Sequence, residues 1–360
     1  MNNSALSYWP NGEMPHRYVW SSADIEGVFV RGLYRSLIAS DALQRLADVR
    51  FLGAIDYFVH PTGRQLHRRR HNRLEHTLGV AHLALICARS MCLNEADEML
   101  IVAAALLHDV GHSPLSHSLE SAFKKEFGIG HHQAGVDILM SRAPNGFGKT
   151  IGPLLRSEKL DPDAVVALFS GSSSERFNFL FGHPINIDTI EAISRSQAYI
   201  KQAQTSPSPQ RILAALLNPS SGVDTLDEFW SLKDRIYKLL IQGPVGLIAD
   251  YIARDYVETH ISSFSSADYF KSERELRRSS PGLFLALESA RSKIAQLLSG
   301  SESRSFTPVT FSARSFSVDY NKLPDNPERY KQHKVSRTIA FSDLLNFSSD
   351  IGNATSEMDF

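Results

Sequence analysis

The stretch ALLHDVGHSPLSH, residues 105–117, is the most informative part of this chain for its fold and for the ligand that it binds. It starts as the end of an apolar run with helical spacing and places His108 and Asp109 side by side, with His112 and His117 close behind. A glycine and a proline interrupt the helix directly after the doublet. An imidazole nitrogen and a carboxylate oxygen at one point suit a catalytic divalent cation. The stretch therefore predicts a metal site at a helix end.

Histidines are concentrated around this stretch. Ten of the 14 histidines lie between His60 and His132, and His76 lies upstream in NRLEHTLGV, residues 72–80. Taken singly, a buried histidine more often donates to a backbone carbonyl than binds a metal. The joint pattern, spread over segments that all appear helical, favours metal binding.

Apolar spacing predicts a helical protein. Residues such as Leu78, Ala81 and Leu85 form one stripe at helical period, and strand signals are almost absent. Helices are predicted over 41–52 (with Asp41 as N-cap), 74–91, 94–107, 116–127, 131–140, 187–202 and in several later segments to residue 298. We therefore expect an all-α fold. Alternating segments at 306–318 and 335–341 predict a small β or irregular appendage at the C-terminus.

Composition bounds the class of protein. A chain of 360 residues with a net charge of −1 can bury a large core and carries no global field toward nucleic acid or a membrane. Its 2 cysteines form no disulfide framework. No apolar run approaches the length of a membrane span, and residues 1–17 lack a signal peptide's apolar centre. We expect a cytoplasmic protein with no membrane contact.

Two motifs resemble one known family, the HD-domain metal-dependent phosphohydrolases, and within it the deoxynucleoside triphosphate triphosphohydrolases. RLEHTLGV at 73–80 is similar to that branch's R-F-E-H-S-L-G-V, and residues 108–117 match every fixed position of H-D-x-G-H-x-P-x-S-H. A looser match follows at 131–135. The resemblance covers roughly residues 30–200 and implies an HD core at 26–205. The residues themselves predict an irregular lead-in at 1–25, an additional helical segment at 206–299, and a linker with the appendage at 300–360.

The resemblance also implies a metal set and its cation. His76, His108 and Asp109 match the first three ligands, and Asp188, which opens a predicted helix, fits the fourth. Asp250 is the competitor, because the run after it resembles the one that follows the family's metal aspartate. The ligand position in that register, however, is Leu247. The cation would be Mn, Fe, Zn, Ni or Mg, and a homo-oligomer is expected.

Further roles follow from the same resemblance. His112 would protonate the leaving oxygen, with His131 in support and Glu120 orienting it, although Glu120 fits a solvated helix acid equally well. The substrate contacts would come from four positions: Arg73, Arg70, Leu52 and His117. His132 is expected on the exposed face of its helix.

The chain departs from the family at the positions that read the sugar. Ala192 and Ser196 stand where that branch has tyrosine and aspartate, and Phe51 stands where a glutamine is found. The metal centre therefore resembles the family more closely than the sugar contacts do.

Three functions remain open on the sequence. The first is hydrolysis of a nucleotide, most simply a (deoxy)nucleoside triphosphate. The second is phosphodiester cleavage in a cyclic or oligomeric nucleotide or single-stranded nucleic acid, which the basic run at 64–73 favours. The third is a regulatory module that binds nucleotide without turnover and contacts a protein partner through its appendage.

Overall fold

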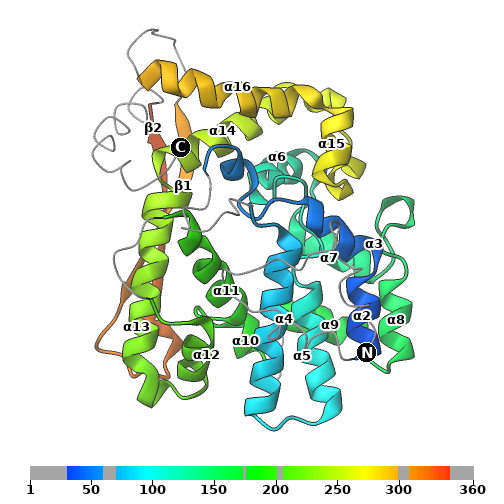
Figure 1. Cartoon of the computed structure of the whole chain (residues 1–360), viewed down its shortest axis with the longest axis vertical. Coiled ribbons are helices and arrows are strands. Elements are labelled where there is room, and N and C mark those ends of the chain that lie inside the picture. Colours follow the sequence, from blue (N-terminus) through cyan, green and yellow to red (C-terminus); the bar gives the residue numbers. More distant parts are fainter. Residues whose placement is uncertain (1–30, 60–69, 173–175, 201–205, 299–307, 341–360) are drawn as a thin grey trace, which may run out of the picture.

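The computed structural model describes residues 31–59, 70–172, 176–200, 206–298 and 308–340. The regular secondary structure of this part of the chain is helical, apart from one two-stranded antiparallel sheet near its C-terminal end (Figure 1). The prediction of an all-α protein with a small β appendage is confirmed. The predicted lead-in at 1–25 and the Ser/Gly-rich linker at 299–305 lie outside the described residues.

The helices follow one another with short connections. Their bounds are α2 Gly32–Ile38, α3 Asp41–Arg45, α4 Arg73–Ser90, α5 Glu95–Leu107, α6 His117–Phe127, α7 His131–Leu139, α8 Ile151–Ser157, α9 Pro162–Phe169, α10 Phe179–Gly182, α11 Ile187–Ser196, α12 Pro209–Leu217, α13 Pro219–Ile236, α14 Pro244–Thr259, α15 Glu273–Ser279 and α16 Pro281–Leu298. A π-helical turn, Tyr237–Ile241, follows α13, and the strands are β1 Val309–Val318 and β2 Tyr330–Ile339.

Side-chain caps fix where the site-bearing helices begin. The Asn72 side chain accepts from the Glu75 backbone N–H at the start of α4, and Asn186 does the same for Thr189 at the start of α11. Both are capping boxes, in which the third helical residue binds back to the cap. The two caps hold the first turns of α4 and α11 in place, and those turns carry His76 and Asp188.

The helix predicted over 41–52 is shorter than expected. Its N-cap is Ser40 rather than Asp41, and helical turns end at Asp48. The reason is tertiary: the Arg50 region pairs with the chain before α4, where the Phe51 N–H donates to the His71 carbonyl at 3.1 Å. The predicted helix over 187–202 also ends early, at Ser196, followed by a short 3₁₀ turn.

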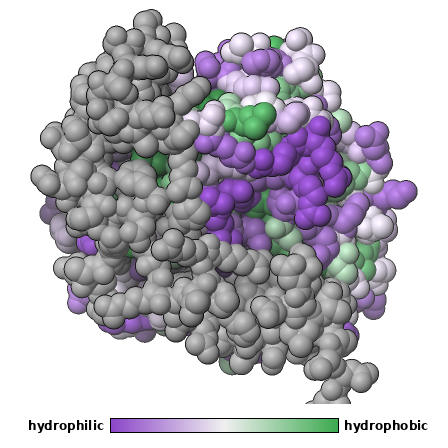
Figure 2. All heavy atoms as spheres, turned by 45° about the horizontal axis from the view of Figure 1, so that its top comes forward, coloured by the Kyte–Doolittle hydropathy of each residue, from purple (hydrophilic) through white to green (hydrophobic). Residues whose placement is uncertain are grey.

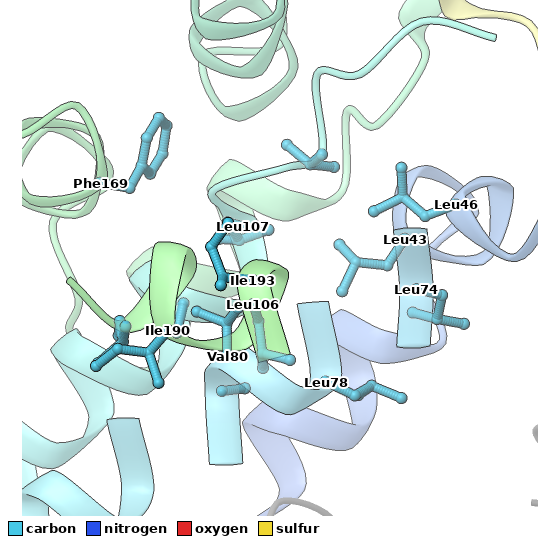
Figure 3. Close-up of a cluster of buried hydrophobic side chains, with 14 of the residues drawn as sticks. Leu43, Leu46, Leu74, Leu78, Val80, Leu106, Leu107, Phe169, Ile190 and Ile193 are labelled. Carbon is cyan, nitrogen blue, oxygen red and sulfur yellow. The ribbon is translucent and has the colours of Figure 1, made fainter. Parts of the chain in front are cut away.

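One apolar core joins the helices that carry the site. α4 packs on α5, and α11 lies across α4. Figure 3 shows Leu78 and Val80 from α4, Leu106 from α5 and Ile190 from α11 meeting within it, and all four are fully buried. Such packing fixes the relative positions of the helix ends.

Gly111 lets the chain pass under α7. A Cβ at this position would lie 2.1 Å from the His131 carbonyl oxygen and 2.3 Å from the Gly135 nitrogen. Only a residue without a side chain fits between His108-Asp109 and the helix that carries His131. The glycine in the motif is therefore a packing requirement of the site.

The predicted appendage is a hairpin with ten residues in each strand, in register from Val309–Ile339 to Val318–Tyr330. It packs along α13: the Trp230 Nε1–H donates to the Ser317 carbonyl at 3.1 Å, and Arg329 forms a two-pronged ion pair with Asp227. β2 begins five residues before the predicted segment at 335. The predicted division into domains, and a protein partner for the hairpin, stay predictions.

The surface view in Figure 2 is dominated by hydrophilic residues where atoms are coloured, and hydrophobic residues appear only in small patches. Among the described helices, none combines the length and apolar character needed to cross a bilayer.

Glu273 is a buried carboxyl that joins α15 to the loops around the site. Its Oε1 accepts from the Arg50 N–H at 2.7 Å and the Leu115 N–H at 3.3 Å, and its Oε2 accepts from the Tyr57 hydroxyl at 3.1 Å. Burial raises the pKa of this carboxyl from 4.5 to about 7, against the lowering effect of Arg50. The folded chain therefore binds more protons than the unfolded chain between these values.

We predict that Gly111→Ala destabilises the protein by about 1–3 kcal/mol, because the new methyl must push α7 away. Urea unfolding measures this. Gly32→Ala is the matched control, since a Cβ there meets nothing within 4 Å. Equal unfolding midpoints for the two variants would contradict the packing argument.

We predict that Glu273→Gln flattens the pH dependence of stability. Because the folded pKa is raised, the wild type loses stability as pH rises from about 4.5 to about 7, by on the order of 1–3 kcal/mol. The amide cannot ionise, so the free energy of unfolding of the variant rises relative to that of the wild type as pH rises through this window. Thermal unfolding at pH about 5 and about 8 tests this, and parallel curves would refute it.

Candidate metal centre

Four predicted ligands converge at one point. His76 and His108 approach each other with their Nε2 atoms 3.3 Å apart, and Asp109 oxygens lie 3.5 Å from His76 Nε2 and 3.4 Å from His108 Nε2. Asp188 Oδ1 lies 3.1 Å from His76 Nε2 and 3.7 Å from His108 Nε2. Ligands about 2.0–2.2 Å from one cation have separations of this size.

The far nitrogens of both imidazoles are held by hydrogen bonds. His76 Nδ1–H donates to Glu191 Oε2 at 2.5 Å, and His108 Nδ1–H donates to the Ala105 carbonyl at 2.8 Å. These bonds leave both Nε2 lone pairs facing the cluster, which is how proteins orient metal-bound histidines. The donor set of two imidazoles and two carboxylates therefore fits a divalent transition metal with open positions.

Glu191 is a site residue that the sequence analysis did not single out. It lies one turn after Asp188 on α11, so both carboxylates reach α4 from the same helix face. Glu191 also forms a buried ion pair with Arg195, whose guanidinium in turn donates to the Glu75 carbonyl at 3.0 Å. The spacing Asp-x-x-Glu on a predicted helix was the signal that could have found it.

The cluster is electrostatically suited to a cation. Burial lowers the pKa of His76, but Glu191, Asp188 and Asp109 outweigh it and raise that pKa to about 9. Burial raises the pKa of Asp109, yet His108, His112 and Arg73 hold it well below its usual range. Without a metal the site therefore attracts a proton to His76, and a divalent cation would take that proton's place.

A second cluster of imidazoles adjoins the first. His112 Nε2 lies 3.1 Å from Asp109 Oδ1, and its ring stacks on His131 with centroids 4.5 Å apart. Glu120 accepts from His117 Nδ1 at 3.0 Å and from His131 Nδ1 at 2.7 Å. Glu120 therefore fixes two imidazoles, rather than standing free as a solvated helix acid. Burial and the nearby Arg73 lower the pKa of His112 well below 6.5.

The turn before α6 is strained and firmly held. Leu115 and Ser116 have φ angles of 58° and 50°, a conformation costly for residues with side chains. Ser116 Oγ donates to the Arg50 carbonyl at 2.6 Å and accepts from Arg73 Nε at 2.9 Å. The turn places His117 beside this second cluster of imidazoles, and the His117 side chain remains 61 % exposed.

Arg73 lines the pocket, and its guanidinium already donates hydrogen bonds within the protein. The Arg73 Nη1–H donates to Asp109 Oδ2 at 2.8 Å, and the residue is buried. The predicted phosphate contact would therefore be shared with a metal ligand. Arg70 is half-buried and is not among the pocket-lining residues, whereas Leu52 lines the pocket.

The clusters open into a pocket of about 630 Å³, a size typical for a small-molecule ligand. Its lining includes the three positions where the chain departs from the resembled family, which are Phe51, Ala192 and Ser196. A smaller cavity of about 260 Å³ is also lined by His108 and Asp188. The exposed His132 lines this smaller cavity, with its ring 4.1 Å from that of His131.

The competing aspartate does not join the metal cluster. Asp250 lines the larger pocket and accepts from Ser118 Oγ at 2.5 Å. Burial raises its pKa to about 6. Leu247, the ligand position in that alternative register, forms apolar pocket wall. Among the candidate fourth ligands, the geometry favours Asp188.

We predict that Glu191→Gln weakens metal binding about 10- to 100-fold, because an amide supports the His76 tautomer less well. Calorimetric titration of Mn(II) into the metal-free protein measures the loss. Glu126→Gln, an exposed carboxylate on α6, is the control and should bind as wild type does. Unchanged Mn(II) affinity in Glu191→Gln would contradict the orienting role.

Comparison with known proteins places part of the chain in a known domain family. Residues 73–163 match the HD domain family, a span that includes His76, His108 and Asp109 but not Asp188. The chain is 26 % identical over 183 residues to the uncharacterized protein YwfO of Bacillus subtilis, covering 48 % of this chain and 41 % of that one.

Among the relatives with descriptive names are two from a mammal and a bacterium. One is the deoxynucleoside triphosphate triphosphohydrolase SAMHD1 of Mus musculus, 34 % identical over 28 % of this chain and 16 % of that protein. The other is a deoxyguanosinetriphosphate triphosphohydrolase-like protein of Brucella anthropi, 34 % identical over 29 % of this chain and 30 % of that one. The chain thus spans less than half the length of these relatives. It contains an HD domain at residues 73–163 and is similar, over part of its length, to deoxynucleoside triphosphate triphosphohydrolases.

Proposed function

We propose that this protein is a metal-dependent phosphohydrolase that cleaves a phosphoester or phosphoanhydride bond of a nucleotide, most simply of a (deoxy)nucleoside triphosphate. One observation carries the proposal: His76, His108, Asp109 and Asp188 meet at a pocket that also holds three further imidazoles. A divalent cation bound there would polarise a phosphoryl oxygen and lower the pKa of a bound water.

The chain's own residues divide the remaining work. Arg73 places a guanidinium between Asp109 and the pocket, where it would offset phosphate charge. His112 would donate a proton to the leaving oxygen. Burial and Arg73 keep its free imidazole neutral, and the negative charge of a bound phosphate would favour the protonated form.

Glu120 and His131 would keep this donor in place. His131 stacks on His112, and Glu120 holds the His131 Nδ1–H at 2.7 Å. Phe51, Ala192 and Ser196 give the pocket small or apolar surface, so discrimination between ribose and deoxyribose would depend on other lining residues.

Turnover assays test the proposal. Wild type and Asp109→Ala are incubated with Mn(II) and a panel of ribo- and deoxynucleotides, cyclic dinucleotides and short single strands, and the products are identified by mass. We expect a nucleotide to be hydrolysed by wild type, with a loss of at least about 10³-fold in the variant.

The products separate the alternatives. Cleavage confined to cyclic or oligomeric substrates would replace the proposal with a phosphodiesterase or nuclease. Nucleotide binding with no turnover of any substrate would replace it with a regulatory module. Asp163→Ala, a change at an exposed acid on α9 away from the pocket, is the control and should retain full activity.

A further inference from the structure

The C-terminal hairpin forms one wall of the pocket that holds the metal centre. Thr310, Phe311, Ser312 and Arg314 of β1 line the same cavity as Asp109 and Asp188. The hairpin is fixed there from two sides: the Phe316 N–H donates to Asp234 on α13 at 3.0 Å, and Arg254 on α14 donates to the Thr310 carbonyl at 3.3 Å. In Figure 1, β1 runs beside α13, and it also contacts α14.

Lys233 is a buried cation in this pocket. The residue is 5 % exposed and lines the cavity. Its ammonium lies 4.5 Å from the centre of the Trp230 ring and 5.0 Å from that of Phe316, and its hydrogen-bond contact is the Pro184 carbonyl at 3.5 Å. Burial lowers the pKa of this amine to about 8 although Asp188 opposes the shift. A buried ammonium without an anion at hydrogen-bond distance is costly.

Arg314 adds a second cation from the hairpin. Its guanidinium contacts the Tyr237 hydroxyl at 3.4 Å, and its backbone N–H donates to Gln242 Oε1 at 3.1 Å. The positive charge of Arg314 helps to lower the pKa of Lys233. Within the described part of the chain, neither side chain forms an ion pair with a carboxylate. Two like charges held in one pocket wall indicate an anionic ligand.

We infer that Lys233 and Arg314 form a subsite for the phosphate tail of a nucleoside di- or triphosphate whose scissile phosphate lies at the His76–Asp188 cluster. This inference rests on the proposed function. A compact ammonium and a planar guanidinium both suit phosphate oxygens. Arg254 serves a different purpose, since it joins α14 to β1 and faces Asp250.

Calorimetry with inorganic phosphates tests the subsite without requiring turnover. The metal-loaded full chain is titrated with the magnesium salts of tripolyphosphate and orthophosphate. We expect wild type to prefer tripolyphosphate. Lys233→Met and Arg314→Gln should each weaken tripolyphosphate binding about 10- to 100-fold and change orthophosphate binding by less than about threefold. Arg314 is exposed, so its variant tests the inference even if Lys233→Met misfolds.

Two charge-matched controls separate a local site from a general field. Lys238 lies five residues after Lys233 and pairs with Asp234, and Arg337 lies on β2 opposite Phe311. Both are exposed and neither lines the pocket. Lys238→Met and Arg337→Gln should bind tripolyphosphate as wild type does. Equal losses in the controls, or no loss in Lys233→Met and Arg314→Gln, would overturn the subsite.

Two other results distinguish this inference from the proposed function. If no nucleotide is hydrolysed but the binding pattern holds, the subsite stands and the proposed function fails. If nucleotides are hydrolysed with the same KM by all variants, the function stands and the subsite fails. A short oligothymidylate that binds more tightly than tripolyphosphate and loses affinity in the same variants would overturn the assignment to a phosphate tail.

Discussion

The Asp109 carboxylate is the interaction on which the site depends. One oxygen lies 3.1 Å from His112 Nε2 and the other accepts from Arg73 at 2.8 Å, while both face the imidazoles of His76 and His108. A single buried anion thus joins the metal cluster, the second imidazole cluster and the arginine. Removing it would leave the Arg73 guanidinium and three imidazoles facing one another without this anion among them.

Holding such a charged centre inside an apolar protein requires rigid surroundings. The capping boxes at Asn72 and Asn186 fix the first turns of α4 and α11, and the core between these helices fixes their separation. The strained turn at Leu115–Ser116 costs free energy that its hydrogen bonds and the buried Glu273 offset. Core packing and helix caps therefore fix the positions of the few polar atoms that form the site.

The pocket combines two parts of the chain with different origins in the sequence. The segment that matches the HD domain carries His76, His108, Asp109 and the three further imidazoles, and the chain after it carries Asp188, α13, α14 and the hairpin. The same metal chemistry can act on different substrates according to what forms the far wall. In this protein that wall carries Lys233 and Arg314, and the positions equivalent to the resembled family's sugar contacts carry small or apolar side chains.

The sequence by itself determined the helical class, and it predicted which residues meet at the candidate metal centre, because both depend on local spacing. Helical periodicity is a property of neighbouring residues, and the His-Asp doublet directly follows the last residue of α5. Asp188 could also be predicted from the sequence, since a helix N-terminus is recognisable from its capping residue. Only the tertiary structure decided that Glu191 orients His76, that the chain after Asp48 leaves its helix, and that the hairpin lines the pocket. These contacts join residues far apart in the chain, and no local pattern specifies which distant surface a side chain will meet.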